Sequence, residues 1–318
     1  MSSPSPPDTP LELIPEVMRE EMRGAKEEKM ANTINSYSDL QIMKCLLTKN
    51  FSEIGRAFED NVITKVKPGA FYQATNLDSI VLPSVVDIGE FAFSECSAGT
   101  ITLPWADIET IRFGAFYKCT SAGMPSAVSF AKATMIDQVA FAGTSDTPNT
   151  WLTSISLPVW TGSAPSNTKF TVTSTQGIFE YCTALTSASL PELVTVPKKL
   201  FYRASAIQEI VLPKCTGFSQ DCFAYCTSLK KLDIGGAVSA ISNNYITGDT
   251  ALEALILRGI TVVPTLSANA FSGTRIASGA AYVYVPRSLE ATVKVAANWT
   301  NYSAQIRAIE DYPAVCGS

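Results

Sequence analysis

The sequence predicts a repeat solenoid, in which short strands stack into a parallel sheet and helical caps close both ends. Three observations carry this prediction: an apolar anchor recurs at near-constant spacing, a strand pattern L-x-x-I-x-L follows it, and Pro often ends that strand. A unit of this length cannot close a core by itself, so it must bury its faces against its neighbours. The fold class that follows is an α/β repeat, the leucine-rich-repeat solenoid.

The anchors set the register of the repeat. Successive anchors are separated by 22, 23, 25, 38, 22, 22, 23 and 25 residues. They are Phe71, Phe93, Phe116, Phe141, Phe179, Phe201, Phe223, Ile246 and Phe271. We expect the anchor side chains to line up along one inner column, because each unit repeats the same path around the core.

The strand pattern supplies the other wall of each unit. Alternate side chains of a strand point to opposite faces, so the apolar positions should face inward. Clear copies of the pattern end at Leu82, Leu157, Leu190, Leu212, Ile234 and Leu257, and looser copies end at Leu103 and Val285. A Pro directly after four of the clear copies should stop further ladder pairing and turn the chain.

Two units resemble a known repeat family. The segments VKPGAFYQATNLDSIVLPSV and FSQDCFAYCTSLKKLDI look like the BspA-like leucine-rich repeats of bacterial surface proteins, and the resemblance covers about residues 62–286. It implies a role in binding rather than catalysis. The opening LLTKNFSEIGRAFEDNVITKVKPGAF and the closing YVYVPRSLEATVKVAANWTNYSAQIRAIEDYP are similar to segments of structural proteins of gut bacterial phages. That second resemblance implies a place in a virion.

The chain divides into four parts. Residues 1–30 should form a flexible arm and an amphipathic helix, 31–61 an N-terminal cap, 62–286 the repeats, and 287–318 a C-terminal cap. Ser288 is expected to cap a helix that runs to about residue 297, and Trp299 adds apolar mass to the same cap. The N-terminal helix reads either as a cap or as a docking or oligomerising segment.

Composition excludes several classes of function. The chain has no His, which removes the Ser-His-Asp and Cys-His forms of catalysis. A glycosidase would need only a carboxylate pair, but no acidic pair recurs at equivalent strand positions. The net charge of −5 disfavours a nucleic-acid partner. We expect no enzyme activity, no cofactor, no membrane insertion and no conventional signal peptide.

Four of the eight cysteines share one position in the repeat. Cys96, Cys119, Cys182 and Cys226 each lie three residues after an anchor, where other units carry Ala74, Thr144, Ala204 or Thr274. A position that accepts Cys, Ala and Thr predicts a small buried ladder. The alternative is a metal or disulfide role for Cys226 with its neighbours Cys215 and Cys222.

Three groups of residues are candidates for binding. The first is the outward strand row, which comprises Val81, Thr102, Ser156, Ser189, Val211, Asp233, Ile256 and Tyr284. The second is the residue after the anchor in three units, namely Tyr72, Tyr117 and Tyr202. The third is Trp151 and Trp160, which flank a strand beside the long insertion between two anchors. Each group has an alternative interpretation without binding. The strand row could be a solvent-exposed face with no partner, the tyrosines could pack between turns, and the tryptophans could be buried under the insertion.

The function predicted is that of a non-catalytic binding protein that recognises a protein or glycan on a bacterial surface. Adhesion or host-receptor binding, as a virion or cell-surface component, fits that role. An architectural virion subunit that contacts other subunits through residues 1–50 is one alternative, and an intracellular interaction scaffold is another. A homo-oligomer joined through the N-terminal helix also stays open.

Overall fold

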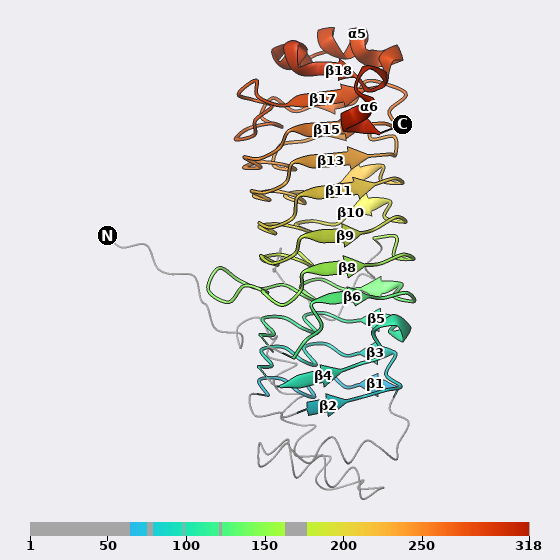
Figure 1. The fold of residues 1–318 in the computed structure, drawn as a ribbon, viewed down its shortest axis with the longest axis vertical. Helices are drawn as coiled ribbons and strands as arrows, with labels where there is room; N and C mark the ends of the chain where they lie inside the picture. Colours follow the sequence, from blue (N-terminus) through green and yellow to red (C-terminus); the bar gives the residue numbers. More distant parts are fainter. Residues whose placement is uncertain (1–63, 75–78, 98, 121–122, 163–176, 318) are drawn as a thin grey trace, which may run out of the picture.

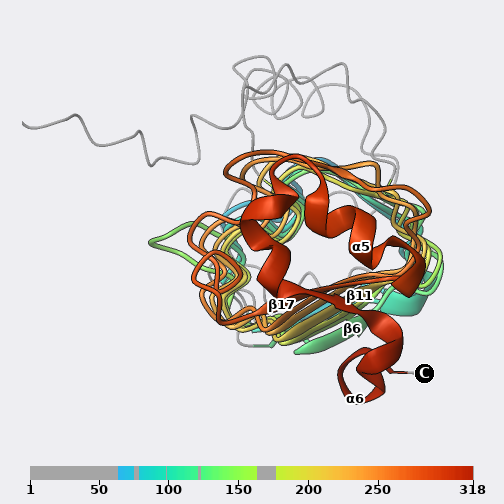
Figure 2. The same cartoon turned by 90° about the horizontal axis from the view of Figure 1, so that it is seen from above.

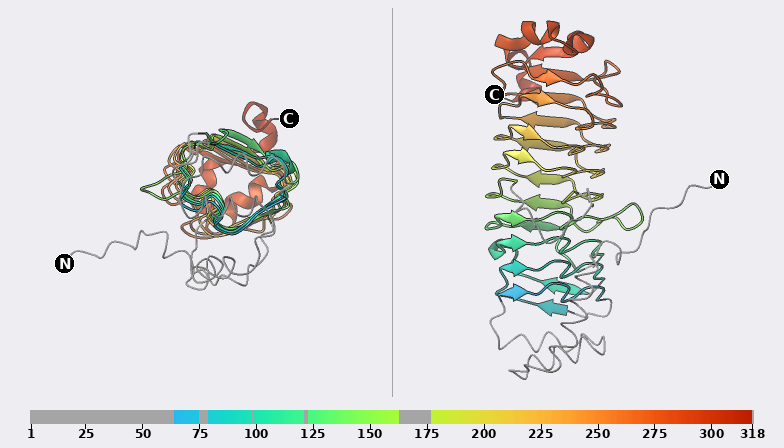
Figure 3. Two further views of the ribbon diagram at one scale, coloured as in Figure 1. Left: turned by 90° about the horizontal axis from the view of Figure 1, so that it is seen from below. Right: turned by 180° about the vertical axis from the view of Figure 1, so that it is seen from behind.

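A computed structural model describes residues 64–74, 79–97, 99–120, 123–162 and 177–317 of the chain. These residues wind into an elongated stack of turns, and strands lie one above another along its long axis (Figure 1). Seen from behind, the strands keep the same order (Figure 3). Every strand pair in this part of the chain is parallel, as a solenoid requires. The predicted solenoid of stacked short strands is confirmed.

The longer strands form one wall of the stack (Figure 1). They are β2 (Ser79–Val81), β4 (Thr100–Thr102), β6 (Ala127–Ser129), β8 (Ser154–Ser156), β9 (Ser187–Ser189), β11 (Glu209–Leu212), β13 (Lys231–Ile234), β15 (Ala254–Leu257), β17 (Tyr282–Val285) and β18 (Ile306–Ala308). The 3-10 helix η1 (Trp105–Asp107) follows β4. The inward side chains alternate as expected, and Ile80, Ile101 and Ile155 are all buried. Strand β6 was not among the strands predicted from the sequence.

A second row of two-residue strands forms another wall, which the sequence analysis did not predict. Its members are β1 (Lys65–Val66), β3 (Asp87–Ile88), β5 (Thr110–Ile111), β7 (Met135–Ile136), β10 (Thr195–Val196), β12 (Gly217–Phe218), β14 (Ala240–Ile241) and β16 (Thr265–Leu266). Most of these strands bury one apolar side chain and leave the other in contact with solvent. A single buried residue per turn gives too short a pattern to be recognised as a strand from periodicity.

The anchor rings stack along the interior. From Phe71 to Phe223, seven successive phenylalanine rings lie 5.1 to 6.1 Å apart, centroid to centroid. The planes of neighbouring rings deviate by no more than 17°. The prediction that Phe93, Phe116, Phe201 and Phe223 share an inner column is therefore confirmed. Such a column makes each unit depend on the one below and the one above it.

The turn around each anchor is itself a hydrogen-bonded ladder. The N–H of Phe93 donates to the carbonyl of Ala115, and the N–H of Phe116 to that of Ala140, both at 2.7 Å. Two residues after the anchor the backbone is left-handed in most turns, although the residue there is often not glycine. These residues are Gln73, Glu95, Lys118, Tyr181, Arg203 and Tyr225, with φ from 52° to 62°. Because each also donates its N–H to the next turn, the ladder holds this otherwise unfavourable conformation.

The small ladder position is confirmed as a buried one. Cys96, Cys119, Cys182 and Cys226 are all buried, as are Ala74, Ala204 and Thr274, whereas Thr144 is half-buried. The thiol of Cys226 donates to the carbonyl of Phe201 at 3.1 Å, and the hydroxyl of Thr274 donates to the carbonyl of Phe271 at 2.7 Å. Small donors at this position therefore satisfy carbonyl groups of the anchor turns.

Helices close the C-terminal end of the stack. Helix α5 (Arg287–Val295) lies across the open end of the last turns (Figure 2). The buried ring of Trp299, in η2 (Trp299–Gln305), packs edge-on against Phe271 at 5.9 Å, and its indole N–H donates to the carbonyl of Pro264. Helices thus cover the C-terminal end as expected, and Tyr302 and Ile306 pack with them. The arm, helix and N-terminal cap expected within residues 1–61 lie outside the described residues.

The start of α5 differs from the prediction. The helix begins at Arg287, and Ser288 is its second residue rather than its N-cap. The N-cap position is held by Pro286, which offers no side-chain acceptor. The carboxylate of Glu310 takes that role from a distant segment and accepts the N–H of Arg287 at 3.0 and 3.2 Å. A negative group at a helix N-terminus is favourable, so a tertiary contact replaces the local cap.

Within the described residues, no helix combines the length and the hydrophobicity needed to cross a bilayer.

Candidate binding surfaces

The outward strand row is open along one part of the stack and covered along another. Val81, Thr102, Ser189 and Val211 are exposed, and Ser156 is half-buried. The last three members, Asp233, Ile256 and Tyr284, are buried, with no more than 3% of their surface exposed. The prediction that Asp233 and Tyr284 present themselves on an open face is therefore wrong.

The C-terminal segment is what covers the row. Residues Ile309–Cys316, which contain η3 (Ile309–Asp311) and α6 (Pro313–Cys316), lie outside the sheet of long strands (Figure 2). The buried side chain of Cys316 packs with Ala254, Ile256 and Tyr284 in a small apolar cluster. The rings of Tyr284 and Tyr312 meet edge-on at 5.4 Å. We call residues 309–316 the C-terminal clasp.

Arg258 joins the clasp to the sheet. Arg258 Nε lies 2.8 Å from Asp233 Oδ1, and a terminal nitrogen of the same guanidinium lies 2.7 Å from Oδ2. That guanidinium also donates to the carbonyl of Cys316. The hydrogen bond to Asp233 raises the pKa of Arg258. The role of Asp233 is thus structural, because its carboxylate is paired with Arg258 beneath the clasp.

The open part of the sheet is a neutral, hydroxyl-rich face. The outward side chains of β4 and of the neighbouring sheet of β6, β8 and β9 are Thr100, Thr102, Ala127, Ser129, Ser154, Ser156, Ser187 and Ser189. The hydroxyl of Ser187 donates to that of Ser154 at 2.9 Å. We call this surface the hydroxyl face. Its side chains are short, so a partner can approach the strands closely at little cost in side-chain entropy.

The two tryptophans are interior residues. Trp160 is fully buried, and only 8% of the surface of Trp151 is exposed to solvent. The indole N–H of Trp151 donates to the carbonyl of Cys119 at 3.0 Å, and its ring meets Phe141 edge-on at 6.2 Å. Neither ring offers a free face to a sugar or protein partner, so their prediction as binding residues is wrong. Residues 143–150, the first part of the insertion, project from the side of the stack instead (Figure 2).

The three tyrosines after the anchors have different surroundings. Tyr117 is buried in a small cluster with Phe91 and Phe113, beside which half-buried Tyr72 packs. Packing between turns, the alternative to a binding role, accounts for these two. Tyr202 is half-buried and lies against two further tyrosines, Tyr181 and Tyr225.

Tyr181 and Tyr225 were missed by the sequence analysis. Both lie two residues after an anchor, in the turns on either side of the one that carries Tyr202 and Arg203. The guanidinium of Arg203 lies over the rings of Tyr181, Tyr202 and Tyr225 at 5.6, 5.4 and 4.9 Å. Alignment of the repeats at the second position after the anchor would have shown Tyr181, Arg203 and Tyr225 in three consecutive units. We call Tyr181, Tyr202, Arg203 and Tyr225 the tyrosine–arginine cluster.

No group of His, Cys, Asp and Glu side chains in the described part of the chain is arranged to hold a metal ion. Burial raises the pKa of Cys215 to about 11 and raises those of Cys222 and Cys226 well above their ordinary value. Thiolates are the form in which cysteine binds metals or attacks substrates, so these buried thiols serve packing rather than chemistry.

A comparison with protein families agrees with the fold. The family described as BspA type leucine rich repeat region matches, in six copies, residues 36–158 and 171–283. No curated protein matches the chain. Among solved structures, the pneumococcal vaccine antigen PcpA is 14% identical with a TM-score of 0.48, over 82% of this chain and 64% of the antigen. The chain thus spans less than two thirds of that antigen.

Two further similar solved structures are leucine-rich proteins. A leucine rich cell surface protein from Faecalibacterium prausnitzii is 14% identical with a TM-score of 0.33, over 80% of this chain and 86% of that one. A leucine-rich repeat protein from Eubacterium ventriosum is 13% identical with a TM-score of 0.28, over 67% of this chain and 80% of that one. The family match covers more than half of the sequence, and it coincides with the stacked turns and the anchor column. This chain belongs to the BspA-type leucine-rich-repeat family.

Proposed function

We propose that the protein is a non-catalytic binding protein that holds a macromolecular partner on its hydroxyl face. The observation that carries the proposal is the contrast along the outward strand row. At β13 to β17 the sheet is covered by the C-terminal clasp, whereas between β4 and β9 the same surface is open. The outward strand positions of the open part carry no charged side chains, which suits contact with an extended protein or glycan surface.

The location of the protein and its partner form part of the same proposal. We place the protein on a virion or on a bacterial cell surface, where it recognises a protein or glycan of that surface. The support is the resemblance of its opening and closing segments to structural proteins of gut bacterial phages. An architectural subunit that touches only other subunits, or an intracellular scaffold, would use the same face differently.

The test places a large charged side chain on the hydroxyl face. Thr102→Arg and Ser189→Arg keep the outward direction of the side chain and obstruct close approach. The matched control is Thr195→Arg, an exposed position on the wall of short strands. Binding of purified protein to candidate bacterial cells should fall about tenfold or more with either face variant and stay within about twofold with the control.

Fractionation of particles from cells separates the alternatives. Association with particle proteins alone, unaffected by Thr102→Arg and Ser189→Arg, would favour the architectural subunit. Recovery only from the cytosol would favour the scaffold. Absence of cell binding by the unaltered protein across the panel would contradict the proposal.

A further inference from the structure

The tyrosine–arginine cluster is a second surface, separate from the hydroxyl face, and it contains an unusually placed cation. Tyr202 stands nearly perpendicular to Tyr181 and to Tyr225, with interplanar angles of 72° and 80° and centroid distances of 6.2 and 5.6 Å. Arg203 lies over all three rings. Three aromatic rings and one guanidinium from consecutive turns therefore form a single unit.

The fold holds this unit in place. Tyr181, Arg203 and Tyr225 occupy the same position of successive turns, where the backbone is left-handed. Their N–H groups donate to the carbonyls of Tyr202, Ala224 and Thr247 at 2.9, 3.0 and 2.9 Å. The side chains are thus repeated at the spacing of the solenoid and fixed to its backbone ladder. A site built this way needs little rearrangement to bind.

Arg203 keeps an uncompensated charge. Glu180, an acid whose charge interacts with that of Arg203, is buried, accepts the N–H of Gly177 at 2.8 Å and lies 3.7 Å from Lys199. Lys199 is therefore the cation that Glu180 balances. Within the described residues, Arg203 has no carboxylate within 4.0 Å, although many other cations, such as Arg112 and Arg275, pair with an acid of a neighbouring turn. Tyr202 is the main cause of a raised pKa of Arg203, and the Arg203 residue is exposed to solvent.

This arrangement favours an anion with a flat apolar body. Aromatic rings that pack against a guanidinium fix the orientation of its plane. The N–H groups at the edge of the guanidinium can then donate two parallel hydrogen bonds to a carboxylate. Tyr225 is 39% exposed, and the rings follow one another at intervals of 5.6 and 6.2 Å, similar to the length of one sugar ring. Tyrosine offers such a partner contact area at a low cost in conformational entropy.

We propose that the tyrosine–arginine cluster binds an acidic saccharide, with Arg203 holding the carboxylate of a uronic or sialic acid. The aromatic part of the site, chiefly Tyr225, packs against the sugar ring. The saccharide class is favoured over an acidic peptide because Arg203 is the single unpaired cation described in the cluster, and three rings surround it. A site for an acidic peptide would present several unpaired cations.

The test measures binding of defined oligosaccharides to the full chain by calorimetry at low salt. The acidic probes are oligogalacturonate and sialyllactose, and their neutral counterparts are the methyl ester and lactose. A poly-glutamate peptide with the same number of carboxylates represents the peptide class. At least one acidic glycan should bind about tenfold or more tightly than its neutral counterpart, and the affinity should fall as salt is added.

Variants connect the binding to the cluster. Arg203→Gln should weaken binding of the acidic glycan about tenfold or more, and Arg203→Lys less so, because lysine keeps the charge without the planar fork. Tyr225→Ala should weaken it severalfold. Arg275→Gln removes the same charge from a paired, exposed arginine, and Tyr282→Ala removes an equally exposed ring beside Arg307. Both control variants should bind within about twofold of the unaltered protein.

The outcomes are distinct. Failure of both acidic glycans to bind, equal binding of the neutral counterparts, or indifference to Arg203→Gln would overturn the proposal. Tighter binding of poly-glutamate than of either glycan, lost in Arg203→Gln, would replace the saccharide with a peptide. Cell binding that survives Arg203→Gln but not Ser189→Arg would leave the function of the hydroxyl face standing, so the two proposals fail separately.

Discussion

Asp233 and Arg258 form a two-pronged ion pair between neighbouring turns, with nitrogen–oxygen distances of 2.8 and 2.7 Å. Asp233 is in β13, and Arg258 follows β15 directly. The pair lies beneath the C-terminal clasp, because Arg258 also donates to the carbonyl of Cys316. One arginine therefore balances a buried charge and holds the segment that decides how much of the sheet is open.

The first prediction concerns this pair. Arg258→Met should lower the free energy of unfolding by about 2–4 kcal/mol, because it leaves the buried carboxylate of Asp233 without its partner. Urea unfolding followed by circular dichroism measures the change. Arg275→Met, which removes an exposed arginine paired with Glu253, is the control and should lower it by no more than about 0.5 kcal/mol. Equal losses of free energy of unfolding in the two variants would show that the ion pair under the clasp stabilises the protein no more than an exposed pair does.

The second prediction uses Cys316 as a reporter of the clasp. Its buried side chain packs against the sheet at Ala254, Ile256 and Tyr284. In Arg258→Met the clasp should detach more often, and labelling of Cys316 by iodoacetamide should accelerate about tenfold or more. Cys182, buried in the ladder, is the internal control and should label slowly in both proteins. Mass spectrometry of the peptides gives both rates, and unchanged labelling of Cys316 would mean that Arg258 does not hold the clasp.

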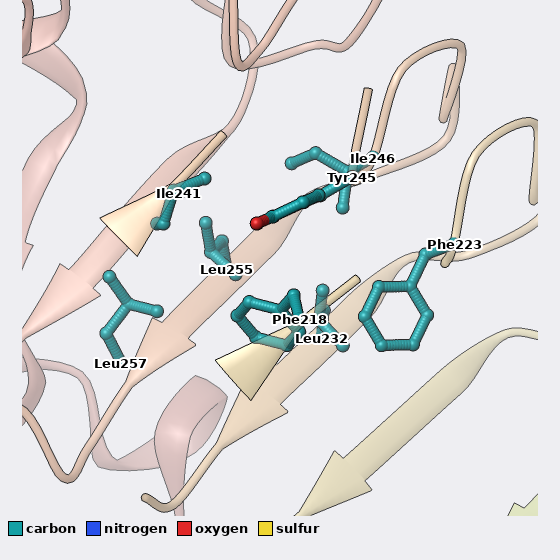
Figure 4. A pocket seen from close by; sticks show the side chains of 8 residues that line it. All are labelled: Phe218, Phe223, Leu232, Ile241, Tyr245, Ile246, Leu255 and Leu257. Carbon is teal, nitrogen blue, oxygen red and sulfur yellow. The ribbon is translucent and has the colours of Figure 1, made fainter. Parts of the chain in front are cut away.

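The third prediction concerns a gap in the anchor column. Ile246 stands where other turns carry Phe, and beside it lies a small apolar pocket lined by Phe218, Phe223, Tyr245 and Leu255 (Figure 4). Ile246→Phe should fill this space and continue the stack above Phe223, which would stabilise the protein by about 0.5–1 kcal/mol. Urea unfolding is the measurement. A loss of more than about 1 kcal/mol would show that the pocket is too small for a ring.

The fourth prediction concerns a buried acid. Asp249 occupies the small ladder position after Ile246, where its Oδ1 accepts the N–H of Cys226 at 2.8 Å and its Oδ2 meets no donor among the described residues. Burial raises the pKa of Asp249 well above its ordinary value. The folded protein therefore holds a proton that the unfolded chain releases above about pH 4.

It follows that the contribution of Asp249 to stability is complete below about pH 4 and is lost as pH rises toward the folded-state pKa. Asp249→Asn keeps the oxygen that accepts from Cys226 but cannot ionise. The stability of the unaltered protein relative to this variant should decline between pH 4.5 and 7.5. Urea unfolding at several pH values measures the difference. A difference that is constant over this range would contradict the prediction.

Much of the fold was predictable from sequence because the repeat encodes contacts between nearest neighbours. The spacing of Phe93, Phe116, Phe201 and Phe223 specified the inner column, and the exchange of Cys, Ala and Thr at one position specified the buried ladder. The wall of short strands was not predictable in the same way. A strand such as β3 (Asp87–Ile88) buries one side chain per turn, which leaves no alternation to recognise.

The candidate surfaces were predicted less well, for two reasons. Trp151 and Trp160 have the residue type of a binding site, but a large ring beside an insertion can turn inward, and both do. Tyr181 and Tyr225 lie one position away from the row chosen in the sequence. That second position has left-handed backbone, which the side chains alone do not reveal.

The sequence by itself determined that this protein is a stack of repeats, where its core lies, and which residues of each strand face outward. Only the tertiary structure decided which of those outward residues remain accessible. The carbonyl of Cys316 meets Arg258 across 58 residues of chain, and this contact belongs to no repeat. Periodicity records interactions that recur from turn to turn, so a single return of the chain onto its own sheet leaves no trace in the spacing of residues.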